Sequence, residues 1–295
     1  MRKTRHSVFS SIRQISAGLT ALCLLPFGAL SAADEPGLVS IDFCADQYLL
    51  ALADRSEIQA VSFEAASPRS YYSARAKGLP TVTGSFEEIL LMRPKMVLRT
   101  WRGGPRAQGI FERAGIASFQ PPFAYSLESN FETFLAVGTK IGHAVKAEAL
   151  IADQKARLAT LKGRPKSSLK GVYMTPSGFT AGTGTFVDGI IKVAGFDTVA
   201  EDADIRSWAP LPLEKMVLSP PDFIVASFFG DADVLVSYWS SGRHGVAERM
   251  MAGLPTIHIP SHYLSCSGAF TVDAAEYIRA EAVKLGLIES EGNAE

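Results

Sequence analysis

The chain has 295 residues, 47% of them hydrophobic, which is enough to bury a large core in two units of ordinary size. Its 29 basic and 30 acidic residues nearly cancel. This balance excludes the strongly basic surface that is typical of nucleic-acid-binding proteins, so we expect no nucleic-acid partner.

Residues 1–33 have the pattern of a secretory signal peptide. Basic residues precede an apolar stretch at 15–30, and "SAA" at 31–33 offers small residues for cleavage. The alternative, a transmembrane anchor, needs about 20 unbroken apolar residues, and Pro26 interrupts this stretch. Removing its four basic residues from the 29 leaves 25 against 30 acidic ones, a net charge of −5. We therefore expect a secreted protein with no membrane span after processing.

Residues 34–126 alternate short apolar runs with helical segments, which is the pattern of parallel β-α-β units. The first run, "LVSIDF" at 38–43, is followed by apolar residues at helical spacing over 45–53. The other elements expected in this N-terminal lobe are strands at 58–63, 96–100 and 115–119 and a short helix at 87–92.

Residues 127–163 predict a single bridging helix. Ser129 and Glu132 have the spacing of a capping box, no proline follows up to Leu161, and apolar residues recur at helical spacing. Such a helix measures roughly 45–50 Å. That length suits a strut between two lobes better than a crossover on one small sheet.

Residues 164–295 restart the alternation as a C-terminal lobe. The expected elements are strands at 171–175, 198–199, 223–227 and 256–259 and helices at 186–194, 214–218 and 272–285. The predicted fold is therefore α/β, with two Rossmann-like lobes of mainly parallel sheet joined by one long α-helix.

One stretch occurs twice, once in each lobe. "FEEILLMRPKMVL" at 86–98 aligns without a gap with "LEKMVLSPPDFIV" at 213–225, so that Glu87 matches Glu214 and Pro94 matches Pro221. The simplest interpretation of the glutamates is an acid at a helix N-terminus, where the helix dipole favours it. The second is a pair of exposed carboxylates that bind arginines of a symmetric partner.

Taken in order, several motifs resemble one family. They are "SIDFCADQYLLALA", "FEEILLMRPKMVL", "GTGTFVDGIIKVAGFDTV" and "LEKMVLSPPDFIV". The chain resembles the periplasmic substrate-binding proteins of ABC importers for iron-siderophores, haem and vitamin B12. The resemblance implies two lobes bridged by a helix, a ligand held between them, and one glutamate per lobe, Glu87 and Glu214, that docks on the dimeric permease.

Ligands of open α/β sheets bind beyond the carboxyl ends of the strands, so the loops after the strands are the candidate site. These loops carry aromatic residues beside arginines, which suits a large, flat, partly anionic ligand. Core or ordinary surface positions are the alternative for any one aromatic, and Trp101 and Trp208 are the preferred candidates. The expected ligand-binding residues are Tyr71, Tyr72, Trp101, Arg102, Tyr125, Arg206, Trp208, Phe228, His262 and Tyr263.

Two cysteines, Cys44 and Cys266, follow the signal peptide. An even number in an oxidising compartment favours a disulfide, with two free thiols as the alternative. Each cysteine follows an expected strand of a different lobe, so a bond would pin the two lobes together on one side.

The preferred hypothesis is a monomeric, non-catalytic receptor without a cofactor. It would carry a metal chelate, first a ferric siderophore and otherwise a corrinoid or haem, to an ABC permease dimer. A metal-ion receptor that uses His262 directly, or an extracytoplasmic chelatase-like enzyme, is the alternative. Metal-site spacings and the G-x-S-x-G and H-E-x-x-H motifs are absent from the sequence.

Overall fold

The computed structural model describes residues 36–229 and 244–289, so the expected signal peptide lies outside the described residues. The first sheet contains five parallel strands in the order β3-β2-β1-β4-β5. Its strands are β1 (Leu38–Ser40), β2 (Ile58–Ser62), β3 (Thr81–Val82), β4 (Met96–Leu98) and β5 (Ala117–Phe119). Its helices are α1 (Phe43–Leu52), α2 (Ser73–Ala76), α3 (Phe86–Met92) and α4 (Ala107–Arg113).

The second sheet contains four parallel strands in the order β11-β10-β6-β8. Its strands are β6 (Lys170–Met174), β8 (Asp197–Thr198), β10 (Phe223–Ser227) and β11 (Thr256–Ile259). Its helices are α7 (Phe186–Val193), α8 (Leu213–Leu218), α9 (Gly245–Gly253) and α10 (Thr271–Lys284). A separate antiparallel pair, β7 (Phe179–Ala181) with β9 (Trp208–Pro210), was not expected.

Four strands of each sheet follow the same order, which gives the repeat in the sequence a structural meaning. Strands β2-β1-β4-β5 of the first sheet correspond to β8-β6-β10-β11 of the second. The repeated stretch forms α3 and β4 in one sheet and α8 and β10 in the other. Within the repeat, Ile89 and Met216 are both buried, and so are Pro94 and Pro221. The mainly parallel α/β fold class is confirmed.

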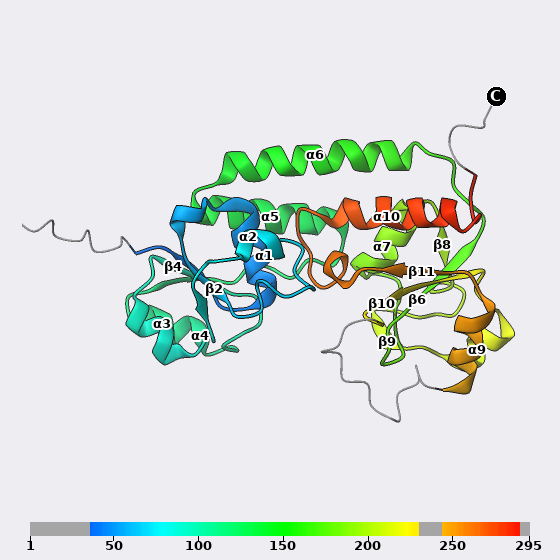
Figure 1. Ribbon diagram of the computed structural model, residues 1–295, viewed down its shortest axis with the longest axis horizontal. Helices are drawn as coiled ribbons and strands as arrows, with labels where there is room; N and C mark the ends of the chain where they lie inside the picture. The colour runs from blue at the N-terminus through cyan, green and yellow to red at the C-terminus, as the bar shows by residue number, and fades with distance from the viewer. Residues whose placement is uncertain (1–35, 230–243, 290–295) are drawn as a thin grey trace, which may run out of the picture. The chain divides into compact units, whose positions relative to one another are not determined.

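The expected single helix over 127–163 is wrong, although its first residue, Leu127, does begin a helix. The segment forms two helices, α5 (Leu127–Ile141) and α6 (Ala144–Lys162), which pack side by side (Figure 1). Gly142 ends α5 with a left-handed backbone, φ +90°, a conformation that costs glycine little and other residues more. The N-cap of α5 is Ser126, whose hydroxyl accepts a hydrogen bond from the Ser129 N–H, so the capping box lies one turn earlier than predicted.

Helices α5, α6 and α10 form a layer along one side of both sheets (Figure 1). The largest buried cluster includes α1, α5, α6, α7 and α10 and is continuous from one sheet to the other. Two smaller clusters lie under α3 and α4 in the first half and under α8 and α9 in the second. The described residues form one compact unit. The lobe boundaries at 126 and 164 therefore stay a prediction.

Candidate functional site

A buried carboxylate fixes the loop that follows β4. Asp42 caps α1 and accepts a hydrogen bond from the Ala45 N–H at 2.9 Å. It also accepts from the Thr100 N–H at 2.6 Å and hydroxyl at 2.5 Å, and from the N–H groups of Trp101 and Arg102 at 3.3 Å each. The backbone of the Trp101 loop is therefore tied to the start of α1. Sequence reasoning missed Asp42, although an aspartate between a strand and a helix is a typical N-cap signal.

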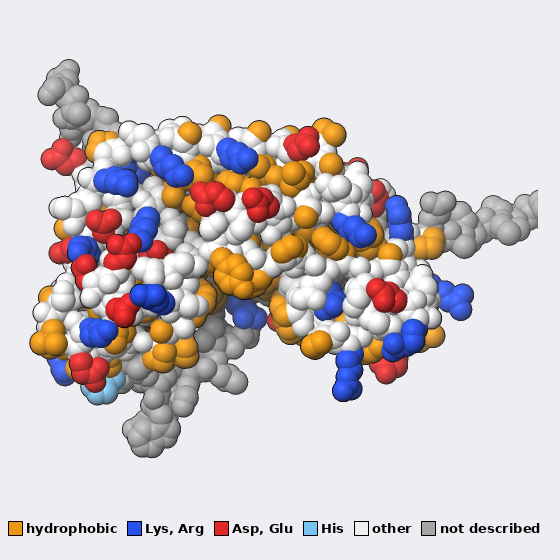
Figure 2. All heavy atoms as spheres, turned by 180° about the vertical axis from the view of Figure 1, so that it is seen from behind, with side chains coloured by type: hydrophobic (Ala, Val, Ile, Leu, Met, Phe, Trp, Pro, Cys, Tyr) orange, Lys and Arg blue, Asp and Glu red, His pale blue; other side chains and the backbone are white. Residues whose placement is uncertain are grey.

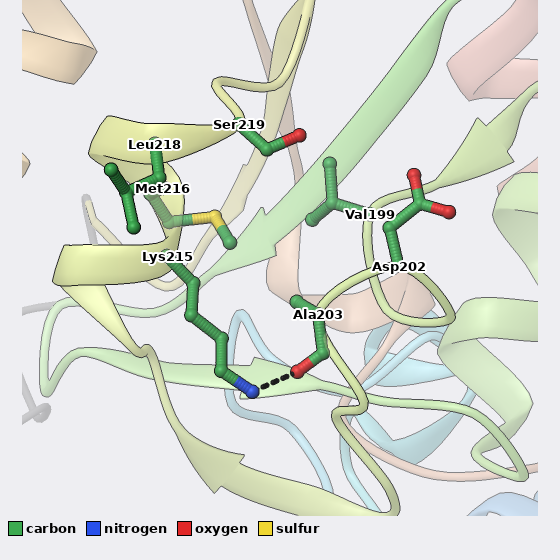
Figure 3. Close-up of a pocket in the computed structure, with 7 residues that line it drawn as sticks. All are labelled: Val199, Asp202, Ala203, Lys215, Met216, Leu218 and Ser219. Carbon is green, nitrogen blue, oxygen red and sulfur yellow. Dashed lines mark hydrogen bonds between the residues drawn. The ribbon is translucent and has the colours of Figure 1, made fainter.

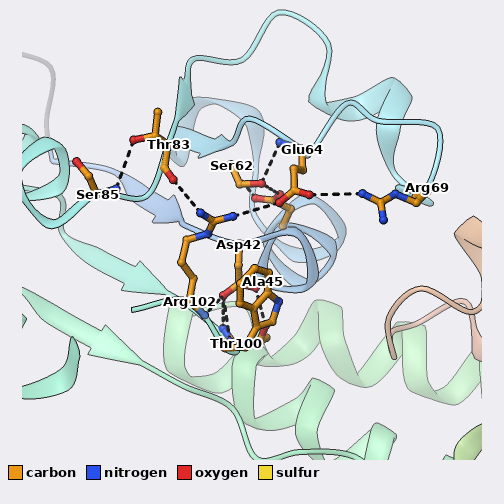
Figure 4. A network of polar contacts seen from close by, with 11 residues as sticks. Asp42, Ala45, Ser62, Glu64, Arg69, Thr83, Ser85, Thr100 and Arg102 are labelled. Atoms are coloured by element: carbon orange, nitrogen blue, oxygen red, sulfur yellow. Dashed lines mark hydrogen bonds and ion pairs between the residues drawn. The ribbon is translucent and has the colours of Figure 1, made fainter. Parts of the chain in front are cut away.

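Two arginines share one carboxylate at the same edge of the sheet (Figure 4). Arg102 pairs with Glu64 at 3.2 Å, and Arg69 pairs with the other oxygen of Glu64 at 3.5 Å. Arg102 also donates to the Thr83 carbonyl at 3.1 Å. All three charged side chains are partly exposed, and together they carry one net positive charge. Such a group can receive an anionic part of a ligand.

Exposed aromatic rings flank this positive group. The Arg102 guanidinium lies 5.0 Å from the Trp101 ring and 5.6 Å from the Phe63 ring, within range of cation–π attraction. Trp101 and Phe63 are each 58% exposed. Phe123 and Tyr125, also exposed, pack edge to face at 4.8 Å in the loop after β5. Large rings left in solvent around a charged group are typical of a ligand-binding surface.

The second lobe presents a smaller aromatic surface. Trp208 is partly exposed on β9, not in a loop as expected, and its ring packs edge to face on Tyr173 of β6 at 5.8 Å. Burial keeps the Tyr173 hydroxyl protonated, because it raises the pKa of that group above its usual value. Phe228 follows β10 with a left-handed backbone, φ +69°, which is unusual for a bulky residue. Arg206 points to solvent and pairs with Asp204 at 3.2 Å.

Four of the expected ligand-binding residues lie together in another place. Tyr71 stacks on Phe270, next to α10, with ring centroids 4.3 Å apart. The rings of Tyr72, Tyr263 and His262 lie 5.0, 5.9 and 6.0 Å from the Tyr71 ring. Burial raises the pKa of Tyr72 to about 12, so it stays neutral. These four rings and Phe270 form an aromatic cluster between the halves of the chain.

A disulfide joins the halves beside this cluster. Cys44 in α1 is bonded to Cys266, and their Cα atoms lie 5.5 Å apart. The hydroxyls of Tyr48 and Ser267 are hydrogen-bonded at 3.1 Å. The Asn130 amide of α5 donates to the Gly268 carbonyl at 2.8 Å. The loop before α10 is thus held to the first half of the chain by a covalent bond and by hydrogen bonds.

Open space between the halves occurs at Tyr125. A pocket of about 490 Å³ is lined by Tyr125 and Ser126 just before α5, by Lys162 of α6, and by Gly184 and Asp188 around the start of α7. Tyr125 thus reaches both the exposed Phe123 ring and a hollow lined by the second half of the chain.

The two glutamates of the repeat lie in the first turns of α3 and α8. Both Glu87 and Glu214 are exposed. Across residues 36–229 and 244–289, neither side chain takes part in an ion pair with another described residue. On the face seen in Figure 2, basic and acidic side chains are interspersed, and hydrophobic side chains gather in a band across the middle.

Within the described ranges, His, Cys, Asp and Glu side chains do not gather in groups of three or more that could hold a metal ion. In the same ranges, helices that combine the length and the apolar character needed to cross a bilayer are absent.

The sequence matches the periplasmic binding protein family over residues 38–233. A curated cobalamin-binding protein of Halobacterium salinarum is 27% identical over 218 residues, 69% of this chain and 57% of that protein. The chain thus spans little more than half the length of this relative.

Two solved haem-binding proteins share the fold. RhuT of Roseiflexus sp. RS-1 in apo form aligns with a TM-score of 0.68 at 22% identity, covering 85% of this chain and 98% of RhuT. HutB of Vibrio cholerae aligns with a TM-score of 0.67 at 20% identity, covering 83% and 98%. The expected family resemblance is confirmed. Because the family match spans more than half of the sequence, the chain belongs to the periplasmic binding protein family.

Proposed function

We propose that the chain is a periplasmic receptor that binds a metal chelate between its two lobes and delivers it to an ABC permease. The N-terminal segment 1–33 would direct its secretion. The observation that carries the ligand class is the Arg69–Glu64–Arg102 group between the exposed rings of Phe63 and Trp101. Aromatic faces match a flat chelate, and the surplus positive charge matches its anionic groups.

Three kinds of chelate fit this description: a ferric siderophore, a corrinoid and a haem. The curated relative is named for binding cobalamin, and RhuT and HutB are named for binding haem. A net positive group favours chelates with free carboxylates or other anionic oxygens. We retain the ferric siderophore as the first candidate, with haem and corrinoid beside it.

The test is a binding titration of the mature protein with a ferric siderophore, haemin and cyanocobalamin, followed by calorimetry. We expect one of the three to bind. Replacing Trp101 with alanine should weaken that binding about tenfold or more, as truncation of a central aromatic contact does. Val145→Ala is the matched control, because Val145 is an exposed apolar residue on α6.

Three results would contradict the proposal. The first is failure of all three chelates to bind, and the second is equal affinity of the Trp101→Ala variant and the native chain. The third is a purified protein that carries metal without any chelate, which would favour the metal-ion receptor instead. Turnover of a tetrapyrrole would favour the chelatase-like enzyme.

Delivery requires a docking surface, for which we propose Glu87 and Glu214. They occupy equivalent positions of the duplicated fold and are exposed, so each can pair with an arginine of one permease subunit. Replacing both with arginine should abolish uptake and leave chelate affinity unchanged.

A further inference from the structure

The repeat places a second pair of residues at equivalent exposed positions. Leu91 in α3 and Leu218 in α8 align with each other, and each is 86% exposed. Their neighbours in the repeat, Ile89 and Met216, are buried under the same helices. A leucine that contributes to neither core and is equally exposed in both copies is not explained by the fold.

Each leucine shares a helix face with its glutamate. Leu91 follows Glu87 by four residues, and Leu218 follows Glu214 by four. Residues four apart in an α-helix lie one turn apart on the same side. Each lobe therefore exposes one carboxylate and one large apolar side chain as a unit, and the chain contains two such units.

The unit on α8 borders a hollow (Figure 3). A pocket of about 290 Å³ lies beside Leu218 and Ser219 and reaches Val199 and Ala203. Lys215 lines the pocket and donates a hydrogen bond to the Ala203 carbonyl. Val217, exposed on the same helix, adds apolar surface. An apolar side chain of a partner could therefore be enclosed between Leu218 and this hollow.

We propose that Leu91 and Leu218 are the apolar contacts of the docking surface, and that each inserts between side chains of one subunit of the two-fold symmetric permease beside an arginine that binds the glutamate. This inference rests on the proposed function, since it names the same partner. Two equivalent units on one chain require a partner with two equivalent halves. A central apolar contact beside a desolvated charge pair is the arrangement in which few residues supply most of the binding energy.

The charges favour a protein over a lipid surface as the occupant. The headgroups of the anionic phospholipids repel carboxylates, and a glutamate lies one turn from each leucine. A partner protein that offers an arginine beside an apolar pocket can bind the glutamate and the leucine of a unit together.

The experiment measures the affinity of the mature protein for the ABC permease dimer of the same organism in nanodiscs. The variants are Leu91→Ser, Leu218→Ser and the double variant, with Val145→Ser as an exposed control on α6. Each single variant should weaken binding about tenfold, from the loss of one buried leucine contact, and the double variant about a hundredfold. The Val145→Ser protein should bind like the native chain, and chelate affinity should be the same in all.

Charge reversal at the two glutamates tests their proposed docking role independently of the leucine contacts. If Glu87→Arg with Glu214→Arg abolishes binding to the permease while the leucine variants bind normally, the leucine contacts are refuted and the docking role of the glutamates stands. If the native chain does not bind the permease at all, both are refuted. If the leucine variants instead lose binding to anionic lipid vesicles, the leucines contact lipid and the inference is wrong.

Discussion

Two buried aspartates at the start of α1 organise the loops of the first lobe. Asp42 accepts five hydrogen bonds, four from the Trp101 loop and one from the Ala45 N–H in the first turn of α1. Asp46, one turn later, accepts hydrogen bonds from the Ser40 hydroxyl and from the Ser62 N–H at 2.9 Å and hydroxyl at 2.5 Å. Asp46 therefore ties α1 to the ends of β1 and β2, close to the Glu64 loop.

Burial raises the pKa of Asp46 from its ordinary 3.8 to about 6, although the hydrogen bonds from Ser40 and Ser62 oppose the shift. Between these values the folded chain holds a proton that the unfolded chain has lost. The contribution of Asp46 to the free energy of unfolding is thus fully present below the ordinary pKa and is lost as the pH rises through about 6. The loss amounts to roughly 3 kcal/mol.

We therefore expect the native chain to gain stability relative to Asp46→Asn as the pH falls from about 7 to about 4.5, by roughly 1–3 kcal/mol. Urea unfolding of both proteins at the two pH values measures this difference. Asp54→Asn, at an exposed position, controls for the loss of a carboxylate in general. A difference that stays constant or shrinks on acidification would show that Asp46 does not titrate in this range.

At the scale of elements, two glycines produce the turn between α5 and α6. Gly142 adopts the left-handed backbone that ends α5, and the His143 N–H then donates to the Gly138 carbonyl at 2.7 Å. A Cβ at Gly138 would lie 2.5 Å from the Cβ of Ala147, so this glycine allows the two helices to approach closely. The apolar spacing continues through the turn, which is why it predicted one helix. The stop signal was Gly142 after Lys140, a typical helix C-terminus.

Gly142→Ala should lower the free energy of unfolding by about 1 kcal/mol, because alanine pays a backbone cost at φ +90° that glycine does not. The position is open to solvent on the Cβ side, so no clash adds to this cost. Gly163→Ala at the end of α6 is the matched control. Its φ is −77° and an added Cβ would make only ordinary contacts, so it should be neutral or slightly stabilising.

Urea unfolding of the two glycine variants measures the difference in their free energies of unfolding. Equal stability of Gly142→Ala and Gly163→Ala would mean that the strained turn is absent and that the segment continues as a single helix.

At the scale of the whole molecule, the order of apolar runs and the repeat were enough to predict two parallel α/β halves of related topology. Periodicity identifies elements but does not say which loops meet. The sequence therefore predicted that Tyr71, His262 and Trp101 belong to one ligand-binding site, because each follows an expected strand. In the structure, Tyr71 and His262 pack near Phe270, while Trp101 stays in solvent beside Arg102. The pair β7–β9 was missed because glycines flank β7 and a proline ends β9, and both residue types are typical of loops.

The link between Cys44 and Cys266 closes a loop of 222 residues and so constrains the unfolded chain strongly. Replacing both cysteines with serine should lower the free energy of unfolding by roughly 2–5 kcal/mol, as measured by urea unfolding.

The bond also fixes the loop before α10 to α1, next to the Tyr71–Phe270 stack, so its loss should allow the two halves to separate further on that side. Small-angle scattering of the ligand-free protein, with and without reductant, measures that opening. Titration of the mature protein, denatured without reductant, should find no free thiol. Two titratable thiols would show that the lobes are held by packing alone, and both the stability loss and the added opening would then be absent.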